Sequence, residues 1–508
     1  MQLIHPSDVP ALDKRAEVEY GLSPRLLMER AGLAVARAVE KHASGKGFVL
    51  IFCGGGNNGG DGYAAALALG EMGYKPLCVD VLGKGQRTEE GRFFLEEYKK
   101  RYGAVATLEV GIAECYAGAV AAVDAVFGTG FSGELPPSCR LLAEAFGKLP
   151  IPVVAVDVPL GCNAETGEVL DGGYTAAATV ALSFYKRGLL SYPARERLGE
   201  VVLDDLGIPR ELGRAFGEDT EAVDSRLAKA WLPPRGKNTH KGSFGHALAF
   251  VGSRRYRGAA LLAAEAGFRM GAGLLTVASE EEVLSSLLRR LPEAILCPLS
   301  YEEGEPLALA VKAAEAGKTA VLAGSGLGRS PALRAAILTL IAEEGCPLVL
   351  DADALNLLAE EDAEKVLSHA GRQVILTPHP MEFARLAKIP VSRVQARRLP
   401  LAEEFARNTG AVLVLKGAGT VVTDGKKTYV NETGSPALAK GGSGDVLAGA
   451  ILGLLAGGMA PLTAAALAVY LHGRAGDALE EEYSDRGVLP SGLGRQMARD
   501  ISRLHKDK

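Results

Sequence analysis

The sequence predicts an α/β protein made of two doubly wound domains. Short β-branched runs alternate with helical patterns from residue 48 to about residue 205, and a second series of the same kind starts with HALAFVGS at residue 246. Such alternation is typical of a parallel sheet with helices on both faces. Between the two series, residues 206–240 mix glycine, proline and charge with little strand character, which indicates a domain boundary near residues 215–225.

The expected elements follow in chain order. An opening helix over about 26–41 starts after Ser23 and Pro24 and has apolar residues at helical spacing. The strands of the first series are FVLIFC, PLCVDVL, AAVDAVF and VVAVDV, with a helix from about Tyr63 after the first of them. The strands of the second series lie in HALAFVGS, LLTVAS, TAVLAGSG, PLVLDAD, QVILTP and AVLVLKG. No period of 20 to 50 residues repeats, so we expect two different domains rather than a duplication.

Length and composition limit the possible classes of protein. A chain of 508 residues is longer than one core usually supports, and we expect domains at residues 1–220 and 225–505. The 48% hydrophobic content and net charge of -5 are those of an ordinary globular protein, which argues against a nucleic-acid partner. The longest apolar run, 446–460, is short and rich in glycine, and the N-terminus lacks the apolar stretch of a signal peptide, so we expect neither a membrane partner nor export.

The cysteines indicate a reducing compartment. They are scattered, odd in number and never spaced CxxC, which argues against a disulfide framework and against a zinc site. We therefore expect a cytoplasmic protein. The seven are Cys53, Cys78, Cys115, Cys139, Cys162, Cys297 and Cys346.

Three polar clusters in the first series follow strands directly. They are GGGNNGGDGY at 54–63, GTGFSGE at 128–134 and DVPLG at 157–161. Parallel sheets bind ligands outside the carboxyl ends of their strands, and glycines with a helix N-terminus suit phosphate groups. One such cluster is often only a tight turn, but three at successive strand ends indicate a binding site. The first cluster fits neither GxGxxG nor a Walker loop.

NNGGDG, Asp124 before GTGFSG, and DVP followed by glycine resemble the NAD(P)H-hydrate epimerase domain over about residues 1–220. The resemblance implies a potassium ion held by Asn58 and Asp124, with Leu160 at a third ligand position that is usually serine. Leu160 has no side-chain oxygen, so only its main chain could serve. The implied substrate residues are Asn57, Asn58, Gly59, Gly60, Asp61, Gly128, Thr129, Gly130, Phe131, Ser132, Gly133, Glu134 and Asp157.

Epimerisation requires a positioned acid or base, because either the C–O bond breaks and re-forms or the ring opens. Asp157 is the first candidate for this role. Lys186, in SFYKRGLLSYP, is a weaker candidate, because a lysine near a strand end is more often solvated.

The most informative motif of the second series is GGSGDVLAGAILG at 441–453. A glycine-rich turn runs into a helix with Asp445 in its first turn, so that backbone N–H groups form an anion site and Asp445 can take a proton from a hydroxyl. This arrangement suits phosphoryl transfer. In the alternative interpretation, Asp445 only stabilises the helix dipole.

With GSGLGR, DADALN, TPHPMEF and KGAGTVVTDG, this motif resembles the ribokinase-like superfamily, and in particular its ADP-dependent NAD(P)H-hydrate dehydratase branch, over about 235–500. The loop ETGSPALAKGG differs from the usual sequence of that family at Ser435 and Leu438. The implied hydrate site comprises Ala260, Gly326, His379 and Asp445, although His379 between two prolines also reads as a structural loop residue. The implied nucleotide site comprises Lys416, Gly417, Ala418, Gly419, Thr420 and Gly444.

The resemblance implies a bifunctional repair enzyme. Its epimerase half would interconvert the R and S hydrates, NADHX and NADPHX, and its dehydratase half would restore NAD(P)H from the S form while ADP becomes AMP and phosphate. Magnesium would bridge the donor phosphates, with Asp351 or Asp353 as possible partners through water. We also expect a homo-oligomer; the choices between ADP and ATP and between NADH and NADPH stay open.

Two alternatives remain at this point. The GGSGD turn is shared by small-molecule kinases of the superfamily, for which the N-terminal domain would be a non-catalytic binding module. The N-terminal domain could also be a scaffold, as Leu160 would permit, but the retained Asn58, Asp61, Asp124 and Asp157 argue against a scaffold.

Overall fold

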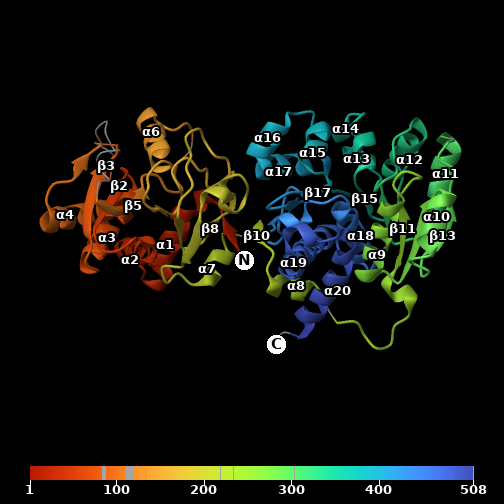
Figure 1. Cartoon of the computed structure of the whole chain (residues 1–508), viewed down its shortest axis with the longest axis horizontal. Coiled ribbons are helices and arrows are strands. Elements are labelled where there is room, and N and C mark those ends of the chain that lie inside the picture. Colours follow the sequence, from red (N-terminus) through yellow and green to blue (C-terminus); the bar gives the residue numbers. More distant parts are fainter. Residues whose placement is uncertain are drawn as a thin grey trace. The chain divides into compact units, whose positions relative to one another are not determined.

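The computed structural model describes residues 1–82, 87–108, 118–131, 133–217, 219–232, 234–302 and 304–506. It forms two compact units, one of Gln2–Glu221 and one of Met1 with Ala222–Lys508. Figure 1 colours the chain along the sequence and labels the elements. Each unit has its own sheet and its own hydrophobic core.

The N-terminal unit is built on a parallel sheet of order β4-β3-β2-β5-β6-β7-β9. Strands β1 and β8 form a separate two-stranded parallel sheet. The strands are β1 (Leu3–Ile4), β2 (Phe48–Cys53), β3 (Lys75–Asp80), β4 (Ala106–Thr107), β5 (Ala119–Ala125), β6 (Val153–Val156), β7 (Ala178–Leu182), β8 (Tyr185–Lys186) and β9 (Glu200–Asp204).

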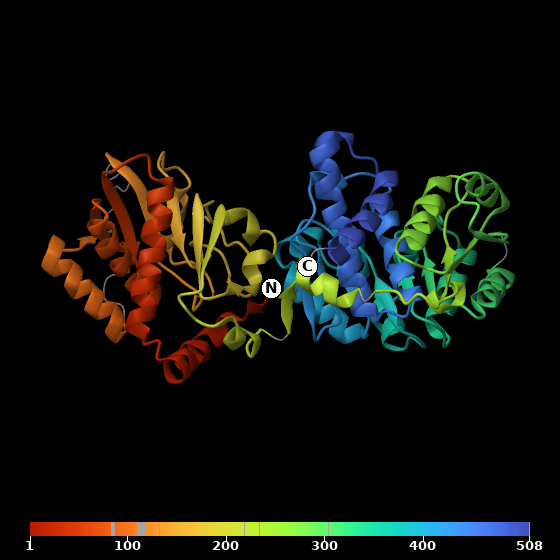
Figure 2. The same ribbon diagram turned by 90° about the horizontal axis from the view of Figure 1, so that it is seen from below.

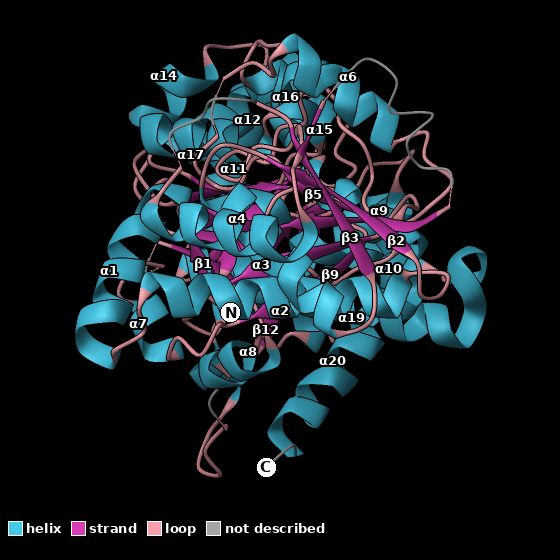
Figure 3. Ribbon diagram, turned by 90° about the vertical axis from the view of Figure 1, so that its left-hand side faces the viewer, coloured by secondary structure: helices cyan, strands magenta, loops and turns pink. Residues whose placement is uncertain are grey.

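Both faces of this sheet are buried, as its uninterrupted apolar strands require. In β2, Val49 and Ile51 belong to the core cluster that contains α2 and α3, while Leu50 and Phe52 belong to the cluster that contains α6. Figure 3 shows β2, β3 and β5 side by side among the helices. The helical segments are η1 (Pro6–Asp8), α1 (Val9–Tyr20), α2 (Pro24–His42), α3 (Asn57–Glu71), α4 (Glu89–Tyr102), α6 (Pro137–Phe146), η2 (Arg187–Leu190), η3 (Ala194–Arg197) and α7 (Arg210–Arg214).

The C-terminal unit has a sheet of order β10-β19-β18-β17-β16-β15-β14-β11-β12-β13. Strands β11 to β17 are parallel, whereas β17, β18 and β19 are antiparallel. The strands are β10 (Thr220–Ala222), β11 (His246–Phe250), β12 (Leu274–Ser279), β13 (Ile295–Pro298), β14 (Ala320–Ala323), β15 (Leu348–Leu350), β16 (Val374–Leu376), β17 (Val412–Leu415), β18 (Val421–Thr423) and β19 (Thr428–Val430).

Helices form two layers on this sheet, one with α9, α18, α19 and α20 and one with α11 to α17, and Figure 2 shows the blue α18–α20 group on one side. The helical segments are α8 (Ser225–Trp231), η4 (Lys241–Phe244), α9 (Arg257–Arg269), α10 (Glu281–Leu288), α11 (Gly304–Glu315), α12 (Pro331–Ala342), α13 (Asp353–Leu358), α14 (Ala363–Ser368), α15 (Pro380–Leu386), α16 (Val391–Ala396), α17 (Arg398–Thr409), η5 (Pro436–Leu438), α18 (Ser443–Ala456), α19 (Pro461–Gly487) and α20 (Pro490–Lys506). Within the described ranges, no helix has both the length and the apolarity needed to cross a membrane.

The expected helix near Tyr63 begins earlier than predicted, at Asn57. NNGGDG is therefore the first turns of α3 and not a loop that precedes the helix. The glycines there serve close packing: a Cβ on Gly59 would lie 2.0 Å from the carbonyl oxygen of Gly54, and one on Gly62 would lie 2.7 Å from the Cβ of Ala125. The missing side chains let α3 approach the strand ends closely.

Gly59→Ala is expected to destabilise the N-terminal unit by about 1–3 kcal/mol, because the added methyl group meets backbone that cannot rotate away. Gly56→Ala is the matched control, since a Cβ at Gly56 meets nothing within 4 Å. Denaturant unfolding of both variants measures the difference. Equal stability of the two variants would show that α3 can shift away from β2.

Candidate active sites

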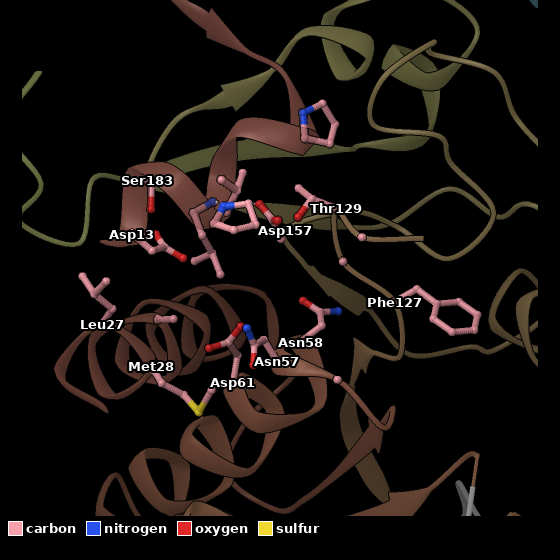
Figure 4. A pocket seen from close by; sticks show the side chains of 18 of the residues that line it. Asp13, Leu27, Met28, Asn57, Asn58, Asp61, Phe127, Thr129, Asp157 and Ser183 are labelled. Atoms are coloured by element: carbon pink, nitrogen blue, oxygen red, sulfur yellow. Dashed lines mark hydrogen bonds between the residues drawn. The ribbon is translucent and has the colours of Figure 1, made fainter. Parts of the chain in front are cut away.

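A cavity of about 640 Å³ opens at the carboxyl ends of β2, β5 and β6 (Figure 4). Asn57, Asn58 and Asp61 reach it from the first turns of α3, and Asp157 reaches it from the loop after β6. The loop after β5 contributes Gly128, Thr129, Gly130 and Phe131. The structure thus brings the three sequence clusters together at one edge of the sheet.

Some of the expected substrate residues do not line the cavity. Gly59 and Gly60 are buried inside α3, and Gly133 and Glu134 are exposed beyond the lining. Ser132 lies outside the described residues. Of the residues in the two motifs, some face the cavity, Gly59 and Gly60 shape α3, and Gly133 and Glu134 do neither.

Lys186 is buried and paired with Asp157, so the expectation of a solvated lysine is wrong. Its Nζ donates to Asp157 Oδ1 at 2.5 Å and to the Leu182 carbonyl at 2.7 Å, and its side chain is 2% exposed. Asp157 also accepts the N–H of Leu182 at 3.2 Å and has a φ of 63°. A non-glycine residue in this region is uncommon and occurs most often where function requires it. The pair forms a fixed, charged centre in the cavity.

Two further carboxylates share the cavity. Burial raises the pKa of Asp61 well above its usual value, and the charges of Asp157 and Asp13 raise it further. Burial also raises the pKa of Asp13, on α1, to about 6, although Lys186 acts in the opposite direction. Sequence reasoning missed Asp13. The available signal was its position on the same face of a helix as Val9 and Ala16.

Asp124 is fully buried and is already satisfied by the protein. Its Oδ2 accepts the N–H of Leu160 at 2.7 Å and the hydroxyl of Tyr174 at 2.8 Å, and its Oδ1 accepts the N–H of Val126 at 3.2 Å. Burial raises its pKa to about 6. The Leu160 side chain packs in the core at 1% exposed, and the Nδ2 of the buried Asn58 has no hydrogen-bond partner in the described residues.

In the C-terminal unit, Asp351 is the centre of a buried polar network. It follows β15 and accepts hydrogen bonds from Ser325 Oγ at 3.0 Å, Thr377 Oγ1 at 2.7 Å and Lys416 Nζ at 3.0 Å. These residues follow β14, β16 and β17, which are neighbours in the sheet. The parallel topology therefore gathers one side chain from each of four strand ends.

Asp445 lies in the first turn of α18, beside this network. Gly442, the residue before the helix, has a φ of 104°, which glycine adopts without strain. Burial and the negative charge of Asp351 raise the pKa of Asp445 to about 7, while Lys416 lowers it. Lys416 also lies 3.3 Å from the position of a Cβ on Gly444. A carboxylate with such a pKa can exchange a proton near neutrality.

His379 caps a helix. Its Nδ1 accepts the N–H groups of Met381 at 3.1 Å and Glu382 at 3.2 Å, and the Glu382 carboxylate accepts the His379 N–H. Burial and the charge of Lys416 lower its pKa, so the ring is neutral. Nε2 lies 3.4 Å from Glu382 Oε1, and the side chain is 48% exposed. His379 thus has the structural role that its proline neighbours indicated, as the cap of α15. Its contact with a substrate stays a prediction.

Ala260, on α9, and Gly326, in the loop after β14, lie close together: a Cβ on Gly326 would lie 2.7 Å from the Cβ of Ala259. Ala260 is 0% exposed, and a Cβ on Gly252 would lie 2.8 Å from its Cβ. Gly326 is partly exposed and has a φ of 66°. Ala260 therefore supports the loop, and only Gly326 offers surface to a ligand.

The loop after β17 supplies the expected nucleotide residues. Gly417 and Ala418 are exposed, while Thr420 is buried and donates to the Gly417 carbonyl at 2.8 Å. Arg398 Nη2, which sequence reasoning missed, donates to the carbonyls of Leu415 and Lys416 at 3.1 Å. The following hairpin, β18 and β19, was also not foreseen, although its DG turn is a hairpin signal.

A second concavity, of about 460 Å³, lies beside Gly328 and Asp353. Asp353 Oδ2 accepts the N–H of Gly328 at 2.8 Å. Three arginines line the concavity and suit phosphate groups: Arg254, Arg255 and Arg329.

Comparisons with known proteins identify the family of each half of the chain. A family model described as YjeF-related protein N-terminus matches residues 25–188, and one described as NAD(P)H-hydrate dehydratase matches residues 247–499. The bifunctional NAD(P)H-hydrate repair enzyme Nnr of Moorella thermoacetica is 37% identical over 97% of this chain and 95% of its own length. This chain belongs to the bifunctional NAD(P)H-hydrate repair enzyme family.

One more relative matches both halves of the chain, and one solved structure matches part of it. The repair enzyme Nnr of Escherichia coli is 31% identical over 99% of this chain and 95% of its own length. The crystal structure of an ADP/ATP-dependent NAD(P)H-hydrate dehydratase from Bacillus subtilis, co-crystallised with ATP/Mg2+, is 34% identical, covers 56% of this chain and 98% of that chain, and has a TM-score of 0.49. Because the repair enzymes match both halves, membership of this family favours the repair function over the small-molecule kinase.

Proposed function

We propose that residues 1–220 interconvert the R and S hydrates of NADH and NADPH and that residues 225–505 dehydrate the S hydrate with ADP as phosphoryl donor. The observation that carries this proposal is the full-length match to repair enzymes, together with acid–base residues at both candidate sites. Family resemblance supports ADP as the donor, and the free cysteines in the described ranges fit a reducing cytoplasm. A homo-oligomer stays a prediction.

In the dehydratase half, Asp445 takes the proton of the hydrate's hydroxyl. The hydroxyl oxygen then accepts the phosphoryl group of ADP, and AMP leaves. Phosphate departs with the C–O electron pair as the ring nitrogen donates its lone pair, and loss of a proton from the next carbon restores the double bond. Hydroxide leaves poorly, so phosphorylation lowers the barrier. Lys416, with the N–H groups of Gly442 and Gly444, stabilises the transferring charge.

Magnesium fits the polar strand ends. Asp351 already accepts three hydrogen bonds, so Asp353 is the better placed carboxylate for the ion or its waters. When bound, the ion would neutralise charge on the donor phosphates. Among the described residues, no group of three or more His, Cys, Asp and Glu side chains is arranged to hold a metal ion.

In the epimerase half, Asp157 is the base that takes the hydroxyl proton of the hydrate. Lys186 donates a hydrogen bond to the carboxylate and fixes its orientation. The donors on α3 and in the loop after β5 would orient the nucleotide around it.

A structural test supports only a weak potassium site. Asp124 accepts three hydrogen bonds from the protein, and Leu160 has no side-chain oxygen and donates its N–H to Asp124. The side-chain donors for a hard cation are thus reduced to Asn58 and one carboxylate oxygen, and Leu160 could add only its main-chain carbonyl.

Exchange of potassium chloride for tetramethylammonium chloride at equal ionic strength is expected to change the epimerisation rate by less than about threefold, which is below 1 kcal/mol in barrier. The measurement is the conversion of one purified epimer into the other, without ADP. A tenfold loss that potassium restores would show that Asp124 exchanges its protein donors for the ion.

The whole function is tested by recovery of NADH absorbance from a mixture of R and S hydrates with ADP and magnesium. Complete recovery requires both activities, whereas recovery of the S portion alone requires only the dehydratase. A protein that leaves both hydrates unchanged but phosphorylates a small alcohol would be a kinase and would refute the proposal.

A further inference from the structure

Asp13 is an acid in the epimerase cavity to which no role has been assigned. It lies on α1, outside all three loop clusters, and lines the cavity with Asp61, Asp157 and Lys186. Figure 4 shows Asp13 and Asp157 on one side of the cavity, with Asp61 opposite them on α3. Neither Asp13 nor Asp61 makes a hydrogen bond or ion pair with any residue that the structure describes.

The charge balance of the cavity requires a stored proton. Lys186 is the single cation among the described lining residues, and Asp157 takes it as its ion-pair partner. Asp13 and Asp61 then have no compensating charge, and two such carboxylates do not both ionise in a buried site. Asp61 is the more buried, whereas Asp13 is partly exposed and can exchange its proton with solvent.

The reaction of the proposed epimerase needs a proton donor close to its base. In an enamine hydrate the hydroxyl and the ring nitrogen are bonded to the same carbon, so the groups that act on them must be neighbours. The charges of Asp157 and Lys186 both act on Asp13, which places it within reach of that centre.

We propose that Asp13 is a catalytic residue of the epimerase half and donates a proton to the ring nitrogen while Asp157 accepts the hydroxyl proton. The C–N bond breaks with its electron pair on nitrogen, and the hydroxyl carbon becomes an aldehyde. Rotation about the neighbouring C–C bond presents the other face of the aldehyde. Nitrogen then attacks the carbon, Asp13 takes its proton back, and Asp157 returns the other, so that the site is reset. This inference rests on the proposed epimerase function.

The groups around Asp13 fix the expected pH dependence. Lys186, Asp157 and Asp61 act on it from three different segments, and Glu90 lines the same cavity. The neighbouring η1 adds Asp8, and α7, which also packs on α1, has only exposed charges: Arg210, Glu211 and Arg214. The pKa of Asp13 is raised to about 6, so its acid form prevails below that pH and is lost above it.

The test uses the full chain and one purified epimer without ADP. Asp13→Asn should lower kcat for epimerisation by about 10²-fold or more, the usual contribution of a general acid. It should also remove the fall of kcat/KM above about pH 6, and Asp13→Glu should restore part of the rate. Glu19→Gln, on the exposed face of the same helix, is the control and should change nothing.

The outcomes separate the two proposals. Wild type that cannot convert the epimers refutes the epimerase function itself. Wild type that converts them while Asp13→Asn keeps kcat, or changes only KM, refutes the catalytic role of Asp13. Recovery of NADH from the S hydrate with ADP should stay normal in Asp13→Asn. This control shows that the variant is folded and that the hydrate preparation is intact.

Discussion

Asp445→Asn is expected to abolish recovery of NADH from the S hydrate, with a loss of about 10²- to 10⁴-fold in kcat, because the amide cannot take the hydroxyl proton. The assay is NADH absorbance with ADP and magnesium present. Asparagine keeps the size of the side chain and its place in the first turn of α18, so unfolding should change little. Glu481→Gln, an exposed position on α19, is the matched control.

The same residue sets the pH dependence of the wild-type dehydratase. The base form of Asp445 is the active one, and its pKa is raised to about 7. kcat/KM should therefore rise with pH below about 7 and level off above it. Full activity in Asp445→Asn, or a wild-type rate that is flat from pH 5 to 9, would assign the base to another residue.

Asp157→Asn is expected to lower the epimerisation rate by about 10²- to 10⁴-fold while leaving dehydration of the S hydrate intact. Asparagine tolerates the positive φ found at this position, so the backbone conformation there should not change. The measurement starts from pure R hydrate with ADP: wild type yields NADH rapidly, whereas the variant yields NADH only as fast as the R hydrate epimerises without the enzyme.

This variant leaves Lys186 buried without its partner, which costs about 3–5 kcal/mol in typical buried pairs. The double variant Asp157→Asn, Lys186→Met removes both charges and separates chemistry from stability. It should recover much of the lost stability and none of the lost epimerisation. Recovery of activity in the double variant would mean that Asp157 acts only to hold the lysine.

The sequence alone determined the features that depend on neighbouring residues. Alternating strands and helices predict parallel sheets, and polar clusters directly after strands converge because all such strand ends lie on one edge. This reasoning placed Asp157 at a cavity and Asp445 at the start of a helix, since both follow from local order. The family of each half was likewise readable from NNGGDG and GGSGD.

Only the tertiary structure decided which distant side chains meet. Lys186 on β8 pairs with Asp157 after β6, Tyr174 donates its hydroxyl to Asp124, and Asp13 enters the cavity from a helix that precedes every motif. The early start of α3 also depended on its contact with β2 and β5, because glycine's low helix propensity is overcome there by close packing. Burial and long-range pairing set the charge of these groups, and neither is encoded in the few residues around each one.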